Sequence, residues 1–332
     1  MTELRLDLTT NEWVIIAHQR AKRPYDFARK KEAKSASAFV QDCPFCLGNE
    51  RLTPPEVARY RRESDAWPWS VRVVPNMFPA LTPHCSNEER LVNSHFGARD
   101  GFGFHEVIIE TPHHNQTLPE MDSSNVELVL QACRDRYEAL SKESGVRTVF
   151  IFKNHGLASG TSLSHPHSQI IAAPVVSAYV KKKIAIAKNH HGGTGKCLYC
   201  DINSWEILSG SRLVSETDRF VVFHPYASHY PFETWISPKR HEACFGNISF
   251  EDLSDLGRVL QGALRRMDSV LGKPDLNYIF HTAPMGYENK EYLHWTIQLV
   301  PRIWTAAGFE MGSGIYINTS VPEETARNMR EA

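Results

Sequence analysis

Two long segments of the chain carry apolar residues at helical spacing. The first covers residues 125–140, and the second covers residues 250–264, with leucine or valine at positions 253, 256, 259, 260 and 264. Because spacings of three and four place side chains on one face of a helix, both segments predict amphipathic helices that pack against a core.

Short runs rich in β-branched and aromatic residues surround these helices and predict strands. The runs are residues 71–74, 105–109, 150–152, 219–222, 232–236 and 278–280. Each helix is preceded by two strands and followed by one, after which a loop enters a histidine-containing strand. This order predicts an α+β fold with mostly antiparallel sheets and flanking helices.

Landmarks of the first half recur in the second half in the same order, which predicts that the chain is a duplication. The pair Cys43/Cys46 matches Cys197/Cys200, residues 150–152 match 278–280, and Glu106, His114, His165 and Gln169 match Glu233, His241, His294 and Gln298. We expect two tandem repeats, residues 1–180 and residues 197–332. The polar segments 24–42 and 181–196 are the expected connectors.

Composition narrows the classes of function. The 332 residues are 42% hydrophobic and 23% charged, with a formal net charge of −1, which is typical of a soluble globular protein without a nucleic-acid partner. No apolar run approaches the roughly 20 residues that a membrane span needs. The first residues lack a signal-peptide pattern, so we expect a cytoplasmic protein. Seven cysteines, an odd number, argue against a disulfide framework.

Each repeat contains a Cys-x-x-Cys pair and two single histidines at matching places. The sets are Cys43, Cys46, His114 and His165, and Cys197, Cys200, His241 and His294. Two thiolates and two imidazoles suit tetrahedral Zn²⁺, and four protein ligands leave no position for a catalytic water, so we expect two structural zinc sites. The alternatives are a redox dithiol, which lacks its usual surrounding pattern here, and unrelated cysteine pairs with core histidines.

The two repeats differ at one histidine. His165 and His167 of the first repeat correspond to His294 and Thr296 of the second. Since alternate residues of a strand share a face, His167 lies beside an expected metal ligand, yet the second repeat has no equivalent. This makes His167 the candidate nucleophile, because a neutral imidazole attacks phosphorus and its phosphorylated form is labile. The alternative is a packed histidine after a serine-rich turn.

Neighbouring residues provide donors for phosphate oxygens. Gly160 and the hydroxyl of Ser162 belong to a small loop upstream of His167, and Gln169 carries a side-chain amide two residues after it. Backbone N–H groups, hydroxyls and amides of this kind stabilise phosphoryl oxygens.

Several segments resemble the galactose-1-phosphate uridylyltransferase family of the HIT superfamily. They are Arg20-Ala21-Lys22-Arg23-Pro24, Cys43-Pro44-Phe45-Cys46, Asn76-Met77-Phe78-Pro79-Ala80-Leu81, Pro112-His113-His114-Asn115-Gln116-Thr117-Leu118, Phe152-Lys153-Asn154-His155-Gly156, Gly160-Thr161-Ser162, His165-Pro166-His167-Ser168-Gln169 and Gly308-Phe309-Glu310. The resemblance spans nearly the whole chain. It implies that each repeat is a HIT-like half of a larger sheet structure.

The resemblance also implies a role for each matching residue. His167 would take the nucleotidyl group, oriented by a backbone carbonyl near His165. The residues implied for substrate binding are Gln169 and Ser162 at the phosphoryl groups with Asn154 nearby, Asn76 and Phe78 at the base and ribose, and Arg20, Arg23, Phe309 and Glu310, which would complete the site across the interface of a homodimer.

The first functional hypothesis is a UDP-glucose–hexose-1-phosphate (galactose-1-phosphate) uridylyltransferase of galactose metabolism, acting by ping-pong exchange through uridylyl-His167. Its partners would be a nucleotide sugar and a sugar 1-phosphate. Met77 and the second Cys-x-x-Cys pair resemble instead the plant ADP-glucose phosphorylase branch, whereas Pro166 is similar to the uridylyltransferases. The alternatives are therefore adenylyl transfer with inorganic phosphate as acceptor, a HIT-type nucleotide hydrolase, and a zinc-stabilised nucleotide-binding module without catalysis.

Overall fold

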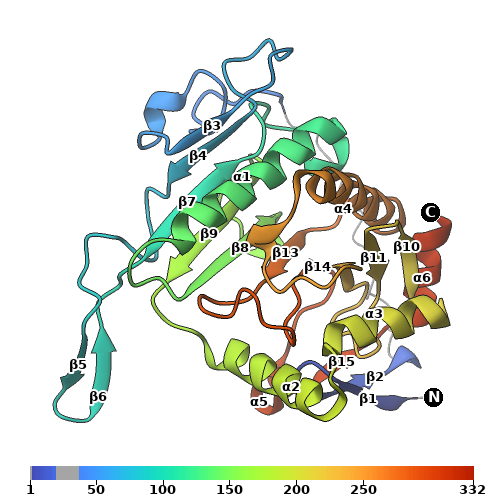
Figure 1. Cartoon of the computed structure of the whole chain (residues 1–332). Coiled ribbons are helices and arrows are strands. Elements are labelled where there is room, and N and C mark those ends of the chain that lie inside the picture. Colours follow the sequence, from blue (N-terminus) through green and yellow to red (C-terminus); the bar gives the residue numbers. More distant parts are fainter. Residues whose placement is uncertain (1, 20–36) are drawn as a thin grey trace.

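The computed structural model describes residues 2–19 and 37–332, and its centre is a ten-stranded antiparallel sheet (Figure 1). The strands run in the order β10-β11-β12-β14-β13-β8-β9-β7-β4-β3. The first half supplies β3 (Ala58–Tyr60), β4 (Val71–Pro75), β7 (Phe104–Ile109), β8 (Thr148–His155) and β9 (His167–Ala173). The second half supplies β10 (Leu213–Glu216), β11 (Phe220–Phe223), β12 (Thr234–Pro238), β13 (Leu276–His281) and β14 (Thr296–Pro301). The predicted α+β class is confirmed.

Two long helices cover one face of this sheet, as the apolar spacing of the sequence predicts. They are α1 (Ser123–Ser141) and α4 (Phe250–Leu271), which lie side by side (Figure 1). Helix α4 begins where Ser249 caps it by accepting from the N–H of Asp252, and it ends at Gly272 in a left-handed conformation. Helix α6 (Pro322–Glu331) packs beside α4 and β10.

The two halves of the chain meet in the middle of the sheet. Strand β8 pairs with its own neighbour β9 on one side and with β13 of the second half on the other. The expected units, residues 1–180 and 197–332, therefore share one continuous hydrogen-bonded sheet. A single large core of buried side chains also runs under α1 and α4.

A smaller layer lies beside the second half of the large sheet (Figure 1). It contains a three-stranded sheet of β1 (Glu3–Asp7), β2 (Glu12–Ile16) and β15 (Tyr316–Asn318), with α2 (Ala178–Thr194), α3 (Leu198–Ser209) and α5 (Gly308–Ser313). The N-terminal strands thus pair with a segment near the C-terminus. Among the described helices, none is both long and apolar enough to cross a membrane.

The connector predicted at residues 181–196 is wrong, because most of that segment belongs to α2. Ser177 caps the helix by accepting from the N–H of Val180 at 3.2 Å, and Gly195 ends it in a left-handed conformation with φ 70°. The lysines and alanines between these caps are strong helix formers, and Ile184, Ile186 and Ala187 pack in a core cluster, so the segment forms a helix despite its many polar residues. The other predicted connector, residues 24–42, lies mainly outside the described residues.

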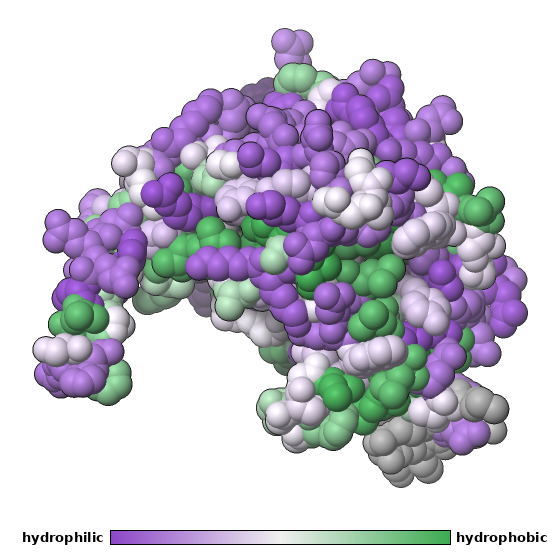
Figure 2. Space-filling model, turned by 60° about the horizontal axis from the view of Figure 1, so that its bottom comes forward, coloured by the Kyte–Doolittle hydropathy of each residue, from purple (hydrophilic) through white to green (hydrophobic). Residues whose placement is uncertain are grey.

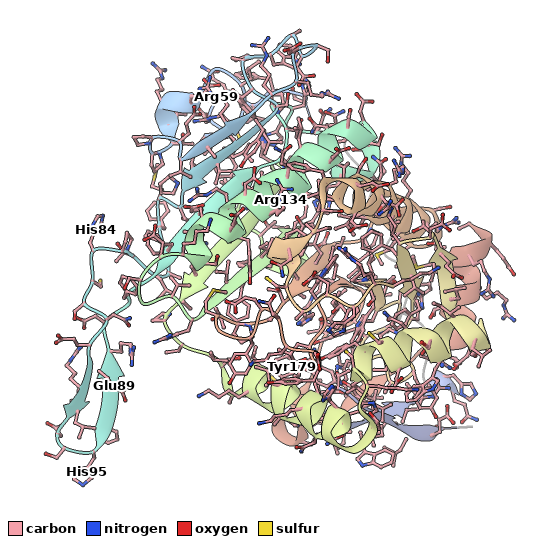
Figure 3. All side chains as sticks on the ribbon, viewed as in Figure 1. Arg59, His84, Glu89, His95, Arg134 and Tyr179 are labelled. Carbon is pink, nitrogen blue, oxygen red and sulfur yellow. The ribbon has the colours of Figure 1, made fainter. Side chains whose placement is uncertain are left out.

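An arm projects from the first half of the molecule. It is the hairpin of β5 (Glu89–Val92) and β6 (Phe96–Arg99), on which Glu89 and His95 are labelled in Figure 3. Figure 2 shows that the surface between this arm and the smaller layer is hollowed and has an apolar floor.

Strand register corrects one detail of the repeat alignment. Gln169 pairs with Val107, and its counterpart Gln298 pairs with Trp235, so the residue that matches Glu233 is His105. The predicted match of Glu106 with Glu233 is therefore wrong by one residue. Likewise Phe152 pairs with Gln169 and Ile279 with Gln298, which shifts the match of residues 150–152 by one. A shift of one residue moves a side chain to the other face of a sheet.

Candidate nucleotidyl-transfer site and metal-binding groups

His167 is the first residue of β9 and is only 6% exposed. Its Nδ1–H donates to the backbone carbonyl of His165 at 2.7 Å; the proton must lie on Nδ1, because a carbonyl can only accept. Nε2 therefore keeps its lone pair, and the aromatic ring of Phe45 packs 5.4 Å from the imidazole. A fixed tautomer with a bare Nε2 is the arrangement that a histidine nucleophile requires.

The surroundings of His167 hold its imidazole neutral. Burial is the main cause that lowers its pKa, and the ammonium of Lys153 lowers the pKa further. The hydrogen bond to the His165 carbonyl and the negative charge of Glu110 act in the opposite direction. Since the net shift is downward, the nucleophilic form of the imidazole dominates at neutral pH.

A buried ion pair lies behind the start of β9. Lys153 donates to a carboxylate oxygen of Glu110 at 2.6 Å and to the backbone carbonyl of His167 at 3.2 Å. The Ser168 hydroxyl contacts both the other Glu110 oxygen and the Tyr278 hydroxyl. These contacts fix the backbone that carries His167. Sequence spacing does not reveal that Lys153 of β8 meets Glu110, which directly follows β7, because the two residues come together only when both strands pair with β9.

Gln169 follows on the same face of β9 and is oriented by His105 of β7. The backbone N–H of Ala80 donates to His105 Nδ1 at 3.1 Å, which places the proton on Nε2. Nε2–H then donates to the Gln169 amide oxygen at 2.9 Å. The Gln169 NH₂ is left as a donor toward the hollowed face, as binding of a phosphoryl oxygen requires. His105 is a further residue of this site whose contact the sequence did not reveal.

The residues expected around the base lie next to His105. Asn76 follows β4 directly; its side-chain oxygen accepts from the N–H of Phe78 at 2.8 Å, and its amide nitrogen lies 3.1 Å from His105 Nε2. Phe78 is 85% exposed, so its ring presents an open face to a ligand. The structure thus brings Asn76, Phe78 and Gln169 together around one histidine.

The other expected phosphate-side residues come from β8 and the loop after it. Asn154 accepts from the side-chain amide of Asn277 at 2.8 Å and lines a hollow of about 680 Å³. Gly160 ends a short 3₁₀ turn (Leu157–Ser159) with φ 86°, a conformation that favours glycine. Ser162 is exposed in the same loop. This loop joins β8 to the strand of His167.

The first metal-binding group joins residues far apart in sequence. Cys43, Cys46, His114 and His165 are buried, with their donor atoms all within 4.8 Å of one another. His165 Nδ1 lies 3.6 Å from both sulfurs, and His114 Nδ1 lies 3.5 Å from Cys46 Sγ. His165 Nε2 donates to the Thr111 carbonyl at 2.8 Å, so Nδ1 is the nitrogen available to a metal.

The second group repeats this geometry. It consists of Cys197, Cys200, His241 and His294. Cys200 Sγ lies 3.4 Å from His241 Nδ1 and 3.5 Å from His294 Nδ1, and His294 Nε2 donates to the Pro238 carbonyl at 2.9 Å. The orienting carbonyl is thus present in both repeats. Each group could hold one metal ion.

Comparison with known proteins assigns the family. The family model described as "Galactose-1-phosphate uridyl transferase, N-terminal domain" matches residues 1–177. ADP-glucose phosphorylase of Arabidopsis thaliana is 36% identical over 99% of this chain and 92% of its own length. The chain belongs to the galactose-1-phosphate uridylyltransferase family. The resemblance stated from the motifs is confirmed.

Other relatives cover the same length. The galactose-1-phosphate uridylyltransferase of Thermotoga maritima is 28% identical over 100% of this chain and 98% of its own. Among solved structures, an ADP-glucose phosphorylase from Arabidopsis thaliana with bound ADP-glucose superposes with a TM-score of 0.84 at 34% identity, covering 100% and 99% of the two chains. A uridylyltransferase structure gives 0.76 at 25% identity, covering 100% and 98%. The chain is an enzyme of this galactose-1-phosphate uridylyltransferase family.

Two of the expected substrate residues, Phe309 and Glu310, lie on α5, which contacts β15. Helix α5 is at the bottom of Figure 1, whereas β4, which precedes Asn76, is near the top. Glu310 is 7% exposed and accepts from the N–H of Ala307, whereas Phe309 is 48% exposed. Arg20 and Arg23 lie outside the described residues.

Proposed function

We propose that this member of the galactose-1-phosphate uridylyltransferase family transfers a nucleotidyl group from a nucleotide sugar by way of a covalent nucleotidyl-His167. The observation that carries the proposal is the hydrogen bond from His167 Nδ1 to the His165 carbonyl at 2.7 Å, which leaves Nε2 unprotonated. In the first half-reaction, the Nε2 lone pair forms a bond to the α-phosphorus. The bond from that phosphorus to the bridging oxygen breaks, and the sugar 1-phosphate leaves with the electron pair.

The second half-reaction reverses the roles. A phosphate oxygen of the acceptor attacks the α-phosphorus, the N–P bond breaks, and the electron pair returns to Nε2. Because a sugar phosphate is a good leaving group, no strong general acid is needed. Gln169 would hold a non-bridging oxygen through its NH₂. The loop that contains Gly160 and Ser162 would supply further donors.

We propose ADP-glucose as the first donor to test, with inorganic phosphate as acceptor. The support is the greater similarity to a plant ADP-glucose phosphorylase, 36% against 28% for the Thermotoga maritima uridylyltransferase. The two Cys/Cys/His/His groups also match the motif pattern of that branch. UDP-glucose with galactose 1-phosphate, our first hypothesis from the sequence, remains the second candidate, because Pro166 is similar to the uridylyltransferases.

We also propose that each Cys/Cys/His/His group holds a structural Zn²⁺. Tetrahedral zinc bound to sulfur and nitrogen has S···N edges of about 3.6 Å, from bonds of roughly 2.3 and 2.0–2.1 Å. The distances between sulfur and Nδ1 in the two groups are 3.4–3.6 Å, so the donors fit this ion. In the first repeat such an ion would hold His165, whose carbonyl orients His167.

A homodimer with shared sites is proposed on the same family basis. Phe309, which is 48% exposed on α5, would then contact the sugar in a partner's site. Mixing an inactive His167→Asn protein with an inactive Arg23→Ala protein should restore part of the activity when subunits exchange. A proven hybrid without recovered activity would contradict shared sites.

The test of the proposed chemistry is isolation of the intermediate. The protein is incubated separately with ADP-glucose and UDP-glucose, each labelled in the α-phosphate, and quenched without acceptor. Label should appear on one histidine peptide that contains His167, and it should leave the protein when phosphate or galactose 1-phosphate is added. Label discharged by water alone at the same rate would indicate a hydrolase instead, and the absence of any adduct would overturn the covalent mechanism.

A further inference from the structure

A cavity of about 180 Å³ lies in the second half of the molecule, between α2, α3, β1 and the face of the large sheet that is opposite α4. Tyr179 and Lys183 of α2, Trp205 and Glu206 of α3, and Trp235 of β12 are among its lining residues; Tyr179 is labelled on α2 in Figure 3. Strand β9, which carries His167, contributes no lining residue. The cavity adjoins the hollow lined by Asn154, with which it shares Tyr179, His229 and Gln298, but none of its lining residues is one of the residues expected at the nucleotidyl-transfer site.

Strand register shows that this cavity lies at the second-repeat counterpart of the residues around His105. Glu233 occupies the position of His105, and Phe223 pairs with Trp235 as Val74 pairs with Val107. Pro225, Tyr226 and Ala227, which line the cavity, therefore correspond to Asn76, Met77 and Phe78 of the first repeat. The cavity thus occupies the place where the first repeat has the residues expected around the base.

Two buried polar atoms of the cavity wall have no hydrogen-bond partner in the described part of the chain. Glu206 Oε2 is one, because Arg212 contacts only Oε1. His229 Nε2 is the other, and its nearest charged group is the Asp7 carboxylate at 3.9 Å. Lys183, which is 9% exposed, adds an ammonium that contacts the rings of Tyr179, Tyr199 and Trp235 at 5.5–5.9 Å.

Unpartnered buried groups of this kind are costly. A native structure keeps few buried donors or acceptors unsatisfied. Two that line one cavity, beside the ammonium of Lys183, indicate a ligand that supplies both donors and acceptors. His281 adds an acceptor: its Nε2–H donates to the Gln298 amide oxygen at 2.8 Å, because the Gln298 NH₂ donates to Glu233, and Nδ1 keeps a lone pair.

The walls also restrict the charge and shape of the ligand. The cavity lining contains three carboxylates (Asp7, Glu206 and Glu233) and two cations (Lys183 and Arg212). This excess of negative charge disfavours a polyphosphate ligand. Trp205 is 50% exposed at the cavity and presents flat aromatic surface, whereas the guanidinium groups of Arg5 and Arg212 lie over the Tyr226 ring at 4.5 and 5.1 Å. A free aromatic face such as that of Trp205 stacks on planar heterocycles such as nucleobases.

We propose that this cavity is a second ligand site, which binds the base of an uncharged nucleoside without transferring it. The proposal rests on the proposed function, since nucleotide chemistry in the first repeat supplies the class of ligand. No transfer occurs there, because Thr296 stands where the first repeat has His167. A nucleoside bound between α2 and β14 would contact the large sheet, which also carries His167. We therefore expect the concentration of the nucleoside to affect the rate of nucleotidyl transfer at His167.

The test is isothermal titration of the full-length protein with adenosine and, separately, with uridine. Wild-type protein should bind one of them. Trp205→Ala should weaken one binding event tenfold or more, and Lys183→Met, which removes the ammonium from the cavity wall, should do the same. Leu208→Ala is the matched control, because Leu208 is 87% exposed on the same helix and is not among the cavity residues. This control should bind as the wild type does.

Asn76→Ala separates this proposal from the proposed function. If Asn76→Ala leaves a nucleoside-binding event that Trp205→Ala removes, the cavity site is supported whatever the first repeat binds. If neither Trp205→Ala nor Lys183→Met alters any binding event, the cavity proposal is overturned, and loss in Asn76→Ala alone would still support the proposed function. Glucose binding that depends on Trp205, with no nucleoside binding, would overturn the ligand class.

Discussion

The first repeat has His167 at the start of β9, whereas the second has Thr296 at the start of β14. Each strand follows a histidine of a Cys/Cys/His/His group. A backbone carbonyl accepts a hydrogen bond from that histidine in each repeat. The glutamines two residues later, Gln169 and Gln298, differ in the hydrogen bonds of their side-chain NH₂ groups. Gln169 keeps its NH₂ as a donor, while the NH₂ of Gln298 already donates to Glu233 at 2.7 Å. The Cys/Cys/His/His group is thus common to both repeats, whereas the combination of His167 and a Gln169 NH₂ that remains a donor occurs in one.

The largest difference between the repeats should appear at the strand starts themselves. His167→Gly should lower nucleotidyl transfer more than about a thousandfold, because the nucleophile is lost. A nucleoside 5′-phosphorimidazolide should restore transfer to His167→Gly, whose cavity admits the extra imidazole, but not to His167→Asn. Rates would be measured with each donor.

The matched variant at the second repeat is Thr296→Val. It keeps the side-chain volume and removes a hydroxyl that has no partner among the described residues. Transfer should stay near the wild-type rate. Near-normal transfer by His167→Gly, or loss of transfer in Thr296→Val, would contradict the proposed division of roles between the repeats.

The metal groups should contribute to stability in both repeats but to catalysis mainly in one. Cys43→Ser and Cys197→Ser should each remove about one equivalent of zinc and destabilise the fold by several kcal/mol, because metal binding contributes to folding free energy. Only Cys43→Ser should also lower kcat in the folded fraction, since His165 orients His167. Metal analysis, thermal unfolding and kinetics check this; a Cys43→Ser protein with unchanged zinc and stability would argue against a structural site.

The glutamine pair should show a smaller difference. Gln169→Ala should reduce kcat/KM by roughly tenfold to a hundredfold, as the loss of one donor to a phosphoryl oxygen does. Gln298→Ala should leave kcat/KM within about threefold, because its NH₂ is already bonded to Glu233. Equal losses in the two variants would mean that the two positions are equivalent after all.

The smallest expected effect concerns the stability of the fold at acid pH. It arises from a histidine of the second repeat whose counterpart in the first repeat is not a histidine. His224 corresponds to Pro75 of the first repeat. It is buried and forms hydrogen bonds with Thr325 and Met329, and burial lowers its pKa to about 3. In the unfolded chain this imidazole takes up a proton near pH 6.5, so stability is lost as the pH falls from 6.5 toward 3. The loss is about 2 kcal/mol by pH 5 at roughly 1.4 kcal/mol per pH unit.

The matched variant isolates this contribution. His224→Gln keeps a polar partner for Thr325 but does not titrate, so its free energy of unfolding should fall less between pH 7 and pH 5 than that of the wild type. Urea unfolding at several pH values measures the difference. Parallel curves for the two proteins would show that His224 is not the acid-sensitive group.

Much of this fold was predictable because the sequence is repeated. The helices α1 and α4, the strand order around them and both metal groups follow from apolar periodicity and from landmarks that recur. Helix α2 was not predicted, because its few large apolar residues form no long stripe at helical spacing among the lysines, histidines and glycines. The sheet of β1, β2 and β15 joins opposite ends of the chain. No local sequence pattern predicts a pairing between such distant segments.

The candidate site was predictable only in part. His167 stood out because its counterpart is a threonine. His105 did not, because the repeat alignment was wrong by one residue, and one residue decides which face of a strand a side chain occupies. Lys153 and Glu110 are 43 residues apart, so their ion pair depends on packing that sequence spacing cannot show.

The junction of β8 with β13 leaves the large sheet with only two outer strands. One of them, β3, has three residues, and the other, β10, has an irregular register between Leu213 and Ser215 and is packed against α6. Short or bulged outer strands are poor templates for backbone pairing with another chain. Any assembly of this protein through the large sheet must therefore be specified by side chains, which makes its partners selective and protects it from open-ended strand addition.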